Sequence, residues 1–251
     1  MFFHFTVFFW TIIFYLGLQF IAFNPIFSTW SWYFFSVIPL IIISLLASRR
    51  LTKRFVDAFI PSLLSLTVPT LLLLIDYSTQ RQIFIVISAF MYYFALLGIY
   101  RLRHAPADKT AKAFLYSAAM AAMFFFYAGV YGFYLNFSFP LWGLMLIFFF
   151  GTALTSFETF IGVDKDQRSR VRMYSVLLGF IMGELVWVMS FWPFGYLTTG
   201  ALSLIFFFVL WDIAVDAFRN KLSLRKAAAR LVFFMGLIIL LLLSSPWHIL
   251  V

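Results

Sequence analysis

Long apolar runs, separated by short polar segments, occupy almost the whole chain. Each run has close to the 20 residues that a helix needs to cross the hydrocarbon core of a bilayer. We therefore expect an all-α polytopic integral membrane protein, a single transmembrane helical bundle over residues 1–251 with tandem helical hairpins and no soluble domain. The nine predicted spans are Phe2–Phe23, Trp30–Ala47, Val56–Ile75, Ile83–Tyr100, Ala113–Leu135, Leu141–Ile161, Met173–Trp192, Leu197–Val215 and Leu231–Leu250.

Basic residues lie on every second connection between these spans. Short basic loops stay in the cytoplasm, because Lys and Arg resist translocation. We therefore expect the even-numbered connections to be cytoplasmic and the N- and C-termini to be outside, in the cell membrane. Of the 18 Lys and Arg residues, Arg81 alone falls on the outer side. The others are Arg49, Arg50, Lys53 and Arg54; Arg101, Arg103, Lys109 and Lys112; Lys165, Arg168, Arg170 and Arg172; and Arg219, Lys221, Arg225, Lys226 and Arg230.

Composition agrees with this picture and narrows the partners. Hydrophobic residues make up 65% of the chain and charged residues 11%, which excludes a water-soluble domain. The net charge of +9 is accounted for by topology and by contact with anionic lipid of the inner leaflet, so no nucleic-acid partner is expected. The chain has no Cys, phosphate-binding loop or dinucleotide fingerprint, and we predict no cofactor, metal site or catalytic residue.

A shift of 58 residues aligns the fifth and sixth spans with the seventh and eighth. Tyr116 and Ser117 then fall on Tyr174 and Ser175, and Glu158 falls on Asp216. The match predicts a duplicated hairpin over residues 113–170 and 171–228, related by an axis along the membrane normal.

Small residues and prolines predict local packing features. Gly179 and Gly183 have the small-xxx-small spacing that lets two transmembrane helices approach closely, most simply inside the bundle. Pro61 and Pro69 in the third span each remove a backbone donor, so a kinked or interrupted helix is expected there.

Most acidic residues lie at the ends of spans. Asp76 is expected to pair with Arg81 on the outer side. Asp212 and Asp216, like Asp57 and Glu158, lie near cytoplasmic helix ends, where ion pairing with the basic clusters is the simplest interpretation. Asp212 is about one turn deeper than Asp216 and is the best substrate- or proton-binding candidate among them.

Glu184 differs, because it follows Met173 by eleven residues, about 16 Å along a helix, and so is expected near the middle of the bilayer. An ionised carboxylate is costly there, so it should be protonated or face a partner or a wet cavity. Two interpretations stay open. Glu184 binds a proton or a polar substrate, or it is a neutral carboxyl that donates to a hydroxyl or backbone oxygen across a helix interface.

Three functions remain from these features. The first is a small transporter or lipid-handling permease, favoured by the repeat, the prolines of the third span and Glu184. The second is a non-catalytic membrane subunit or scaffold that binds a partner protein. An intramembrane lipid-modifying enzyme is least favoured, because catalysis needs at least two converging polar groups and only Glu184 lies deep.

Overall fold

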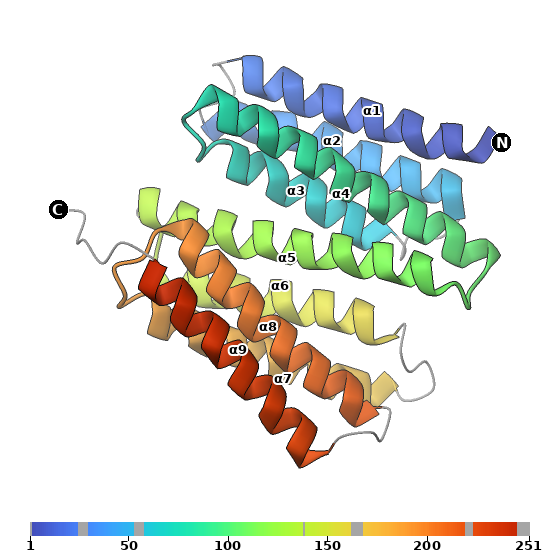
Figure 1. Cartoon of the computed structure of the whole chain (residues 1–251). Coiled ribbons are helices and arrows are strands. Elements are labelled where there is room, and N and C mark those ends of the chain that lie inside the picture. The colour runs from blue at the N-terminus through green and yellow to red at the C-terminus, as the bar shows by residue number, and fades with distance from the viewer. Residues whose placement is uncertain are drawn as a thin grey trace. The chain divides into compact units, whose positions relative to one another are not determined.

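The computed structural model describes residues 2–24, 30–52, 58–137, 139–161, 168–218 and 223–244. Helices form nearly all of this part of the chain, which contains no strand (Figure 1). The helices are α1 (Phe2–Phe23), α2 (Trp30–Thr52), α3 (Phe59–Leu72), α4 (Ser78–His104), α5 (Lys109–Asn136), α6 (Leu141–Ile161), α7 (Arg168–Met189), α8 (Tyr196–Phe218) and α9 (Leu224–Ser244).

Each predicted span overlaps one of these helices, and the all-helical class is confirmed for the described residues. Val56 and Asp57 of the third predicted span and residues 245–250 of the ninth lie outside the described chain. Seven helices, namely α1 and α4 to α9, are long and apolar enough to cross a membrane. Several run beyond the predicted apolar limits, since a helix continues through charged residues at its end. α4 begins five residues before Ile83 and ends four residues after Tyr100.

The third helix is shorter than the apolar run predicted. α3 has 14 residues, about 21 Å, against a hydrocarbon core of about 30 Å. Pro61 lies in its first turn, where the missing backbone donor has no helical partner to lose. Pro69 lies inside the helix, which ends three residues later.

The chain divides into two compact units, Met1–Phe125 and Phe126–Val251, and the division falls within α5. In the first unit α1 packs on α4, while α2 and α3 pack on each other and on α4. The ring of Phe14 in α1 stacks on Tyr92 of α4 with 4.1 Å between centroids. The Tyr92 hydroxyl is 3.0 Å from the hydroxyl of Ser44, which also bonds to Ser65, so a buried polar cluster joins α2, α3 and α4.

In the second unit glycines set the spacing of the helices. A Cβ atom at Gly179 of α7 would lie 2.6 Å from the carbonyl oxygen of Phe149 in α6, and one at Gly183 would lie 3.2 Å from that of Met145. A Cβ atom at Gly200 of α8 would lie 2.6 Å from the Cβ of Ala128 in α5. The backbones of α6 and α7 therefore touch along the Gly179–Gly183 seam. α9 packs on α8.

The first unit corrects the expected position of the N-terminus. Arg50, near the end of α2, lies over the ring of Trp10 at 5.8 Å, and Arg81, near the start of α4, donates to the carbonyl of Ala22. The start of α1 is therefore on the same side as the basic end of α2 (Figure 1). If the basic ends are cytoplasmic, so is the start of α1, because two antiparallel helices, α1 and α2, separate it from the basic end of α2 and an even number of crossings returns the chain to the same side.

Candidate functional site

The outward face of α7 is an apolar stripe that contains a single acid. Glu184 is exposed, with Phe180 one turn before it and Trp187 and Val188 one turn after it, all of them exposed. The stripe, called the Glu184 face below, consists of Met173, Val176, Leu177, Phe180, Glu184, Trp187, Val188 and Phe191.

The packing of α7 on α6 explains why Glu184 points outward. Gly183 is buried against α6, and successive side chains of a helix are about 100° apart around its axis. Gly179, one turn earlier, fixes the same buried side, so the side chain at position 184 projects away from the seam. The two glycines of the seam therefore determine the direction of the acid.

The depth of Glu184 also follows from the bounds of α7. It lies five residues before Met189, where the helix ends, which is about 7.5 Å along the axis. It lies twelve residues after Arg172, which is about 18 Å. Glu184 is thus within the apolar part of α7, nearer the end that is opposite to the basic residues.

No hydrogen bond or ion pair joins Glu184 to another residue that the structure describes. The neutral carboxyl bonded across a helix interface, one of the two interpretations of the sequence, does not occur within this chain in the described ranges. The acid is presented on an apolar surface, where it can meet lipid or another molecule.

Asp212 has a clear partner. The Nη1 atom of Arg230, in α9, lies 2.7 Å from Oδ2 of Asp212 and 2.7 Å from Oδ2 of Asp216. One guanidinium therefore bridges two carboxylates that are one turn apart on α8. The structure thus contains the ion pairs with a basic residue that the sequence favoured for Asp212 and Asp216. The carboxylate of Asp212 is therefore already paired with Arg230.

In unit 1, the expected pair of Asp76 and Arg81 does not form. Arg81 donates from Nη2 to the carbonyl of Ile75 at 2.8 Å and from Nη1 to that of Ala22 at 3.3 Å. Asp76 is exposed and is not among the ion pairs of the described residues. Carbonyl oxygens at the end of α1 and in the turn after α3 lie closer to the guanidinium, and the sequence carries no signal for such backbone contacts.

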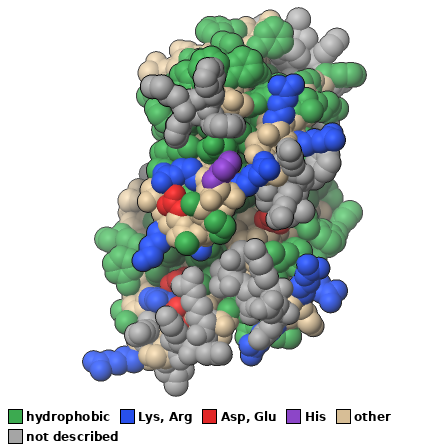
Figure 2. All heavy atoms as spheres, turned by 90° about the vertical axis from the view of Figure 1, so that its right-hand side faces the viewer, with side chains coloured by type: hydrophobic (Ala, Val, Ile, Leu, Met, Phe, Trp, Pro, Cys, Tyr) green, Lys and Arg blue, Asp and Glu red, His purple; other side chains and the backbone are tan. Residues whose placement is uncertain are grey.

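Several of the basic residues that the sequence predicts to be cytoplasmic lie at the ends of their helices. Arg103 donates to the carbonyl of Leu51 at 2.6 Å, and Arg101 pairs with Asp108 at 2.7 Å. Figure 2 looks onto a face where Lys and Arg side chains gather. Asp57 and five predicted basic residues lie outside the described chain, namely Lys53, Arg54, Lys165, Arg219 and Lys221, as does the side chain of Lys226.

The buried hydroxyl contacts were missed by sequence reasoning. Besides the Ser44 cluster, the Tyr127 hydroxyl lies 2.8 Å from that of Thr152, and the Trp211 indole donates to Thr159 at 3.0 Å. Most of these helices contain several Ser, Thr or Tyr residues, so the sequence alone does not show which of them meet.

Long apolar helices with basic ends, a mainly apolar interior and an exposed acid on an apolar face define a polytopic helical membrane protein. Residues 42–244 match the model of a family described as protein of unknown function (DUF5656), and the chain belongs to that family. No curated protein and no solved structure matches the chain.

Proposed function

We propose that this protein is a non-catalytic subunit of a complex in the cell membrane, and that it binds a transmembrane helix of a different polypeptide through the Glu184 face. The observation that carries the proposal is the exposed position of Glu184 in the middle of an apolar stripe. A bound helix would remove the acid from lipid and supply a hydrogen-bond donor to it.

The energetic argument rests on the cost of an acid in hydrocarbon. Acidic residues within membrane helices almost always face a bundle interior, pair with a charge or line a wet cavity. Glu184 is exposed, and it pairs with no charged group among the described residues. A partner helix with a Lys, Arg, amide or hydroxyl group at the same depth would satisfy it, and the flanking Phe180 and Trp187 provide apolar contact area around the polar bond.

The chemistry of the face favours a different polypeptide over a second copy. A second copy would bring another acid to the same depth, and the Glu184 face itself carries no Lys or Arg. A two-fold pairing would therefore place two carboxyls together. A partner with a complementary donor leaves neither group unpaired.

We further propose an orientation in which the basic helix ends, and with them the start of α1, lie in the cytoplasm. The positive-inside rule supports this orientation. The basic residues would then meet anionic lipid of the inner leaflet.

The permease hypothesis makes a different demand on Glu184. Proton coupling or substrate binding needs a water-accessible path to the acid inside the protein. Its position about 7.5 Å from the end of α7 shortens such a path, but the side chain points away from the neighbouring helix α6.

To test the proposal, the protein is extracted in its native lipid and purified through a small affinity tag. The protein composition of the purified complex is then measured. We expect a stoichiometric second protein with the wild-type chain. Glu184→Leu should reduce its recovery about tenfold, because one interhelical polar contact contributes about 1–2 kcal/mol. Glu184→Gln should retain more of it than Leu, since the amide keeps the hydrogen bond.

Asp76→Leu is the matched control, because it removes an exposed acid outside the Glu184 face. It should leave the composition unchanged. Recovery of the chain alone, of two copies of it, or of a complex that survives Glu184→Leu contradicts the proposal. A chain recovered alone with a small molecule that Glu184→Gln loses supports the permease instead.

A further inference from the structure

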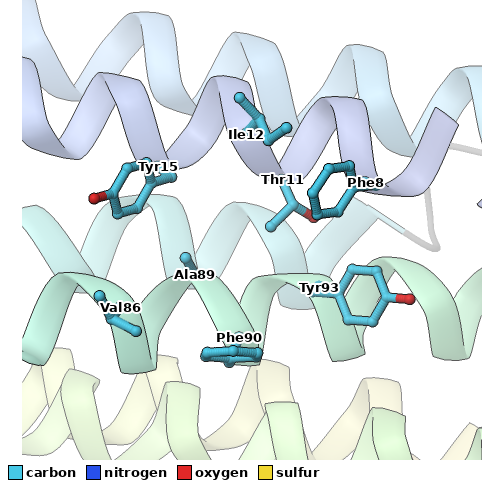
Figure 3. Close-up of a pocket in the computed structure, with 8 residues that line it drawn as sticks. All are labelled: Phe8, Thr11, Ile12, Tyr15, Val86, Ala89, Phe90 and Tyr93. Carbon is cyan, nitrogen blue, oxygen red and sulfur yellow. The ribbon is translucent and has the colours of Figure 1, made fainter. Parts of the chain in front are cut away.

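A groove of about 370 Å³ runs between α1 and α4 of the first unit (Figure 3). Its volume is in the range of small-molecule binding sites. Thr11 and Ala89 form its floor, and Phe8, Tyr15, Phe90 and Tyr93 form its walls. Thr11 and Ala89 are buried while Phe8 and Phe90 are more than half exposed, so the groove opens on the outer surface of the helix pair.

Small residues on both helices create the groove. Thr11 and Ala89 leave a hollow between helices whose other contact residues are large. The Thr11 hydroxyl donates to the carbonyl of Val7 at 2.9 Å, so it is satisfied within α1. The Tyr15 and Tyr93 hydroxyls point away from each other, along opposite directions of the groove (Figure 3). The surface between them suits a hydrocarbon chain.

Polar groups follow at one end of the groove. The Tyr15 hydroxyl accepts from the Gln19 amide at 2.9 Å, and that amide also donates to Gln82 at 2.6 Å. Gln82 donates back to Gln19 at 3.1 Å, which leaves one of its two N–H groups uncommitted in these bonds. Gln19 and Gln82 lie one turn beyond Tyr15 and Val86, and they join α1 to α4 directly above the apolar walls.

A cation completes this end. Arg81 precedes Gln82, and its guanidinium is held by the carbonyls of Ile75 and Ala22. These are neutral acceptors, and no ion pair to Arg81 occurs among the described residues. The guanidinium has five N–H donors, of which three are used in these bonds. It is also the single Lys or Arg that the sequence places on this side of the membrane.

We propose that this site binds one glycerophospholipid of the surrounding leaflet, with an acyl chain in the groove and the phosphate on Arg81. The order of groups along the helices matches the order along the lipid. The apolar groove extends about 10 Å from Phe8 to Tyr15, the Gln82 amide reaches the ester carbonyls, and Arg81 lies at the helix ends. Arg binds phosphate through paired charge-assisted hydrogen bonds, which are stronger than those it makes to carbonyls.

The experiment uses the full chain in nanodiscs of phosphatidylcholine that contain phosphatidylglycerol with a photoreactive group midway along one acyl chain. Cross-linked peptides are mapped by mass spectrometry, and retained phosphatidylglycerol is counted by native mass spectrometry. We expect one retained lipid, cross-linked to residues 8–15 and 86–93.

Two variants remove the two halves of the site. Ala89→Phe fills the floor, and Arg81→Gln removes the phosphate ligand. Each should weaken retention about tenfold, the effect of losing one charge-assisted hydrogen bond or its equivalent in apolar contact. Ala89→Leu, a smaller filling, keeps the test valid if the Phe variant does not fold.

Ala228→Phe and Arg225→Gln are the matched controls, since both positions are exposed on α9. They should retain the lipid as the wild type does, and free glycerol phosphate should not displace it. The proposal is overturned if cross-links spread evenly over the apolar surface, if either site variant retains the lipid like the wild type, or if glycerol phosphate displaces it.

Discussion

At the scale of single residues, the bridge made by Arg230 shows how charges at a helix end are accommodated. Asp212 and Asp216 lie one turn apart on α8, so their carboxylates repel each other. The single positive charge of Arg230 contacts both carboxylates, offsets their repulsion and attaches the first turns of α9 to α8. The three side chains are between 17% and 34% exposed, so solvent screens the interaction only in part.

We expect Arg230→Met to lower the free energy of unfolding by about 1–2 kcal/mol, because it leaves two adjacent carboxylates without a counter-ion. Arg225→Met, at an exposed position in the same helix, should have little effect. Adding Asp212→Asn to Arg230→Met should recover part of the loss, since one repulsive charge is gone. Denaturant titration in detergent micelles measures all three, and additive losses in the double variant contradict the bridge.

At the scale of elements, the α6–α7 seam determines which side of α7 is exposed. Three glycines differ in how closely they approach a neighbouring helix, as measured by the distance from an added Cβ atom to the nearest atom of that helix. A Cβ atom would lie 2.6 Å from a carbonyl oxygen at Gly179 and 3.2 Å at Gly183, whereas nothing lies within 4 Å at Gly236 of α9. A backbone oxygen cannot turn aside as a flexible side chain can.

The order of destabilisation should therefore be Gly179→Ala, then Gly183→Ala, then Gly236→Ala. Overpacking at Gly179 should cost about 1–3 kcal/mol. Gly236→Ala should cost nothing and could gain up to about 1 kcal/mol, because Ala is the better helix former. Thermal unfolding in micelles gives the order, and equal losses at Gly179 and Gly236 would contradict close packing at the seam.

At the scale of the whole molecule, the alternation of helix direction determines which connections share a side. In unit 1, α2 and α4 end together at the basic side, where Arg103 reaches the carbonyl of Leu51. In unit 2, α9 starts beside the end of α8 and so ends on the opposite side. Because the chain has no Cys, a single engineered Cys can report on which side of the membrane its position lies.

A membrane-impermeant maleimide added to intact cells should label Tyr77→Cys and Ser244→Cys. It should label Phe5→Cys and Ser223→Cys only after the membrane is opened, because Phe5 lies on the side where the basic end of α2 lies and Ser223 precedes the basic start of α9. Labelling of Phe5→Cys in intact cells would restore an external N-terminus. Immunoblot mass shifts on the same samples provide the measurement.

The sequence determined the helices and their alternation, because both depend on local quantities. A run of about 20 apolar residues is enough to predict a span, and a basic loop is enough to predict its side. These predictions needed no knowledge of which helices touch. The bounds differed where a helix continues through charged residues, as α4 does, or ends soon after a proline, as α3 does after Pro69.

The tertiary structure decided the direction of each polar side chain. Glu184 is an obvious candidate in the sequence, but its exposure depends on Gly183 touching Met145 of another helix. Arg81 contacts a backbone carbonyl that lies 59 residues earlier in the chain, and the α1–α4 groove exists because two small residues, Thr11 and Ala89, line it together. Nearly every face of these helices is apolar, so hydrophobic periodicity does not show which face is buried, and only the packing of helix on helix selects it.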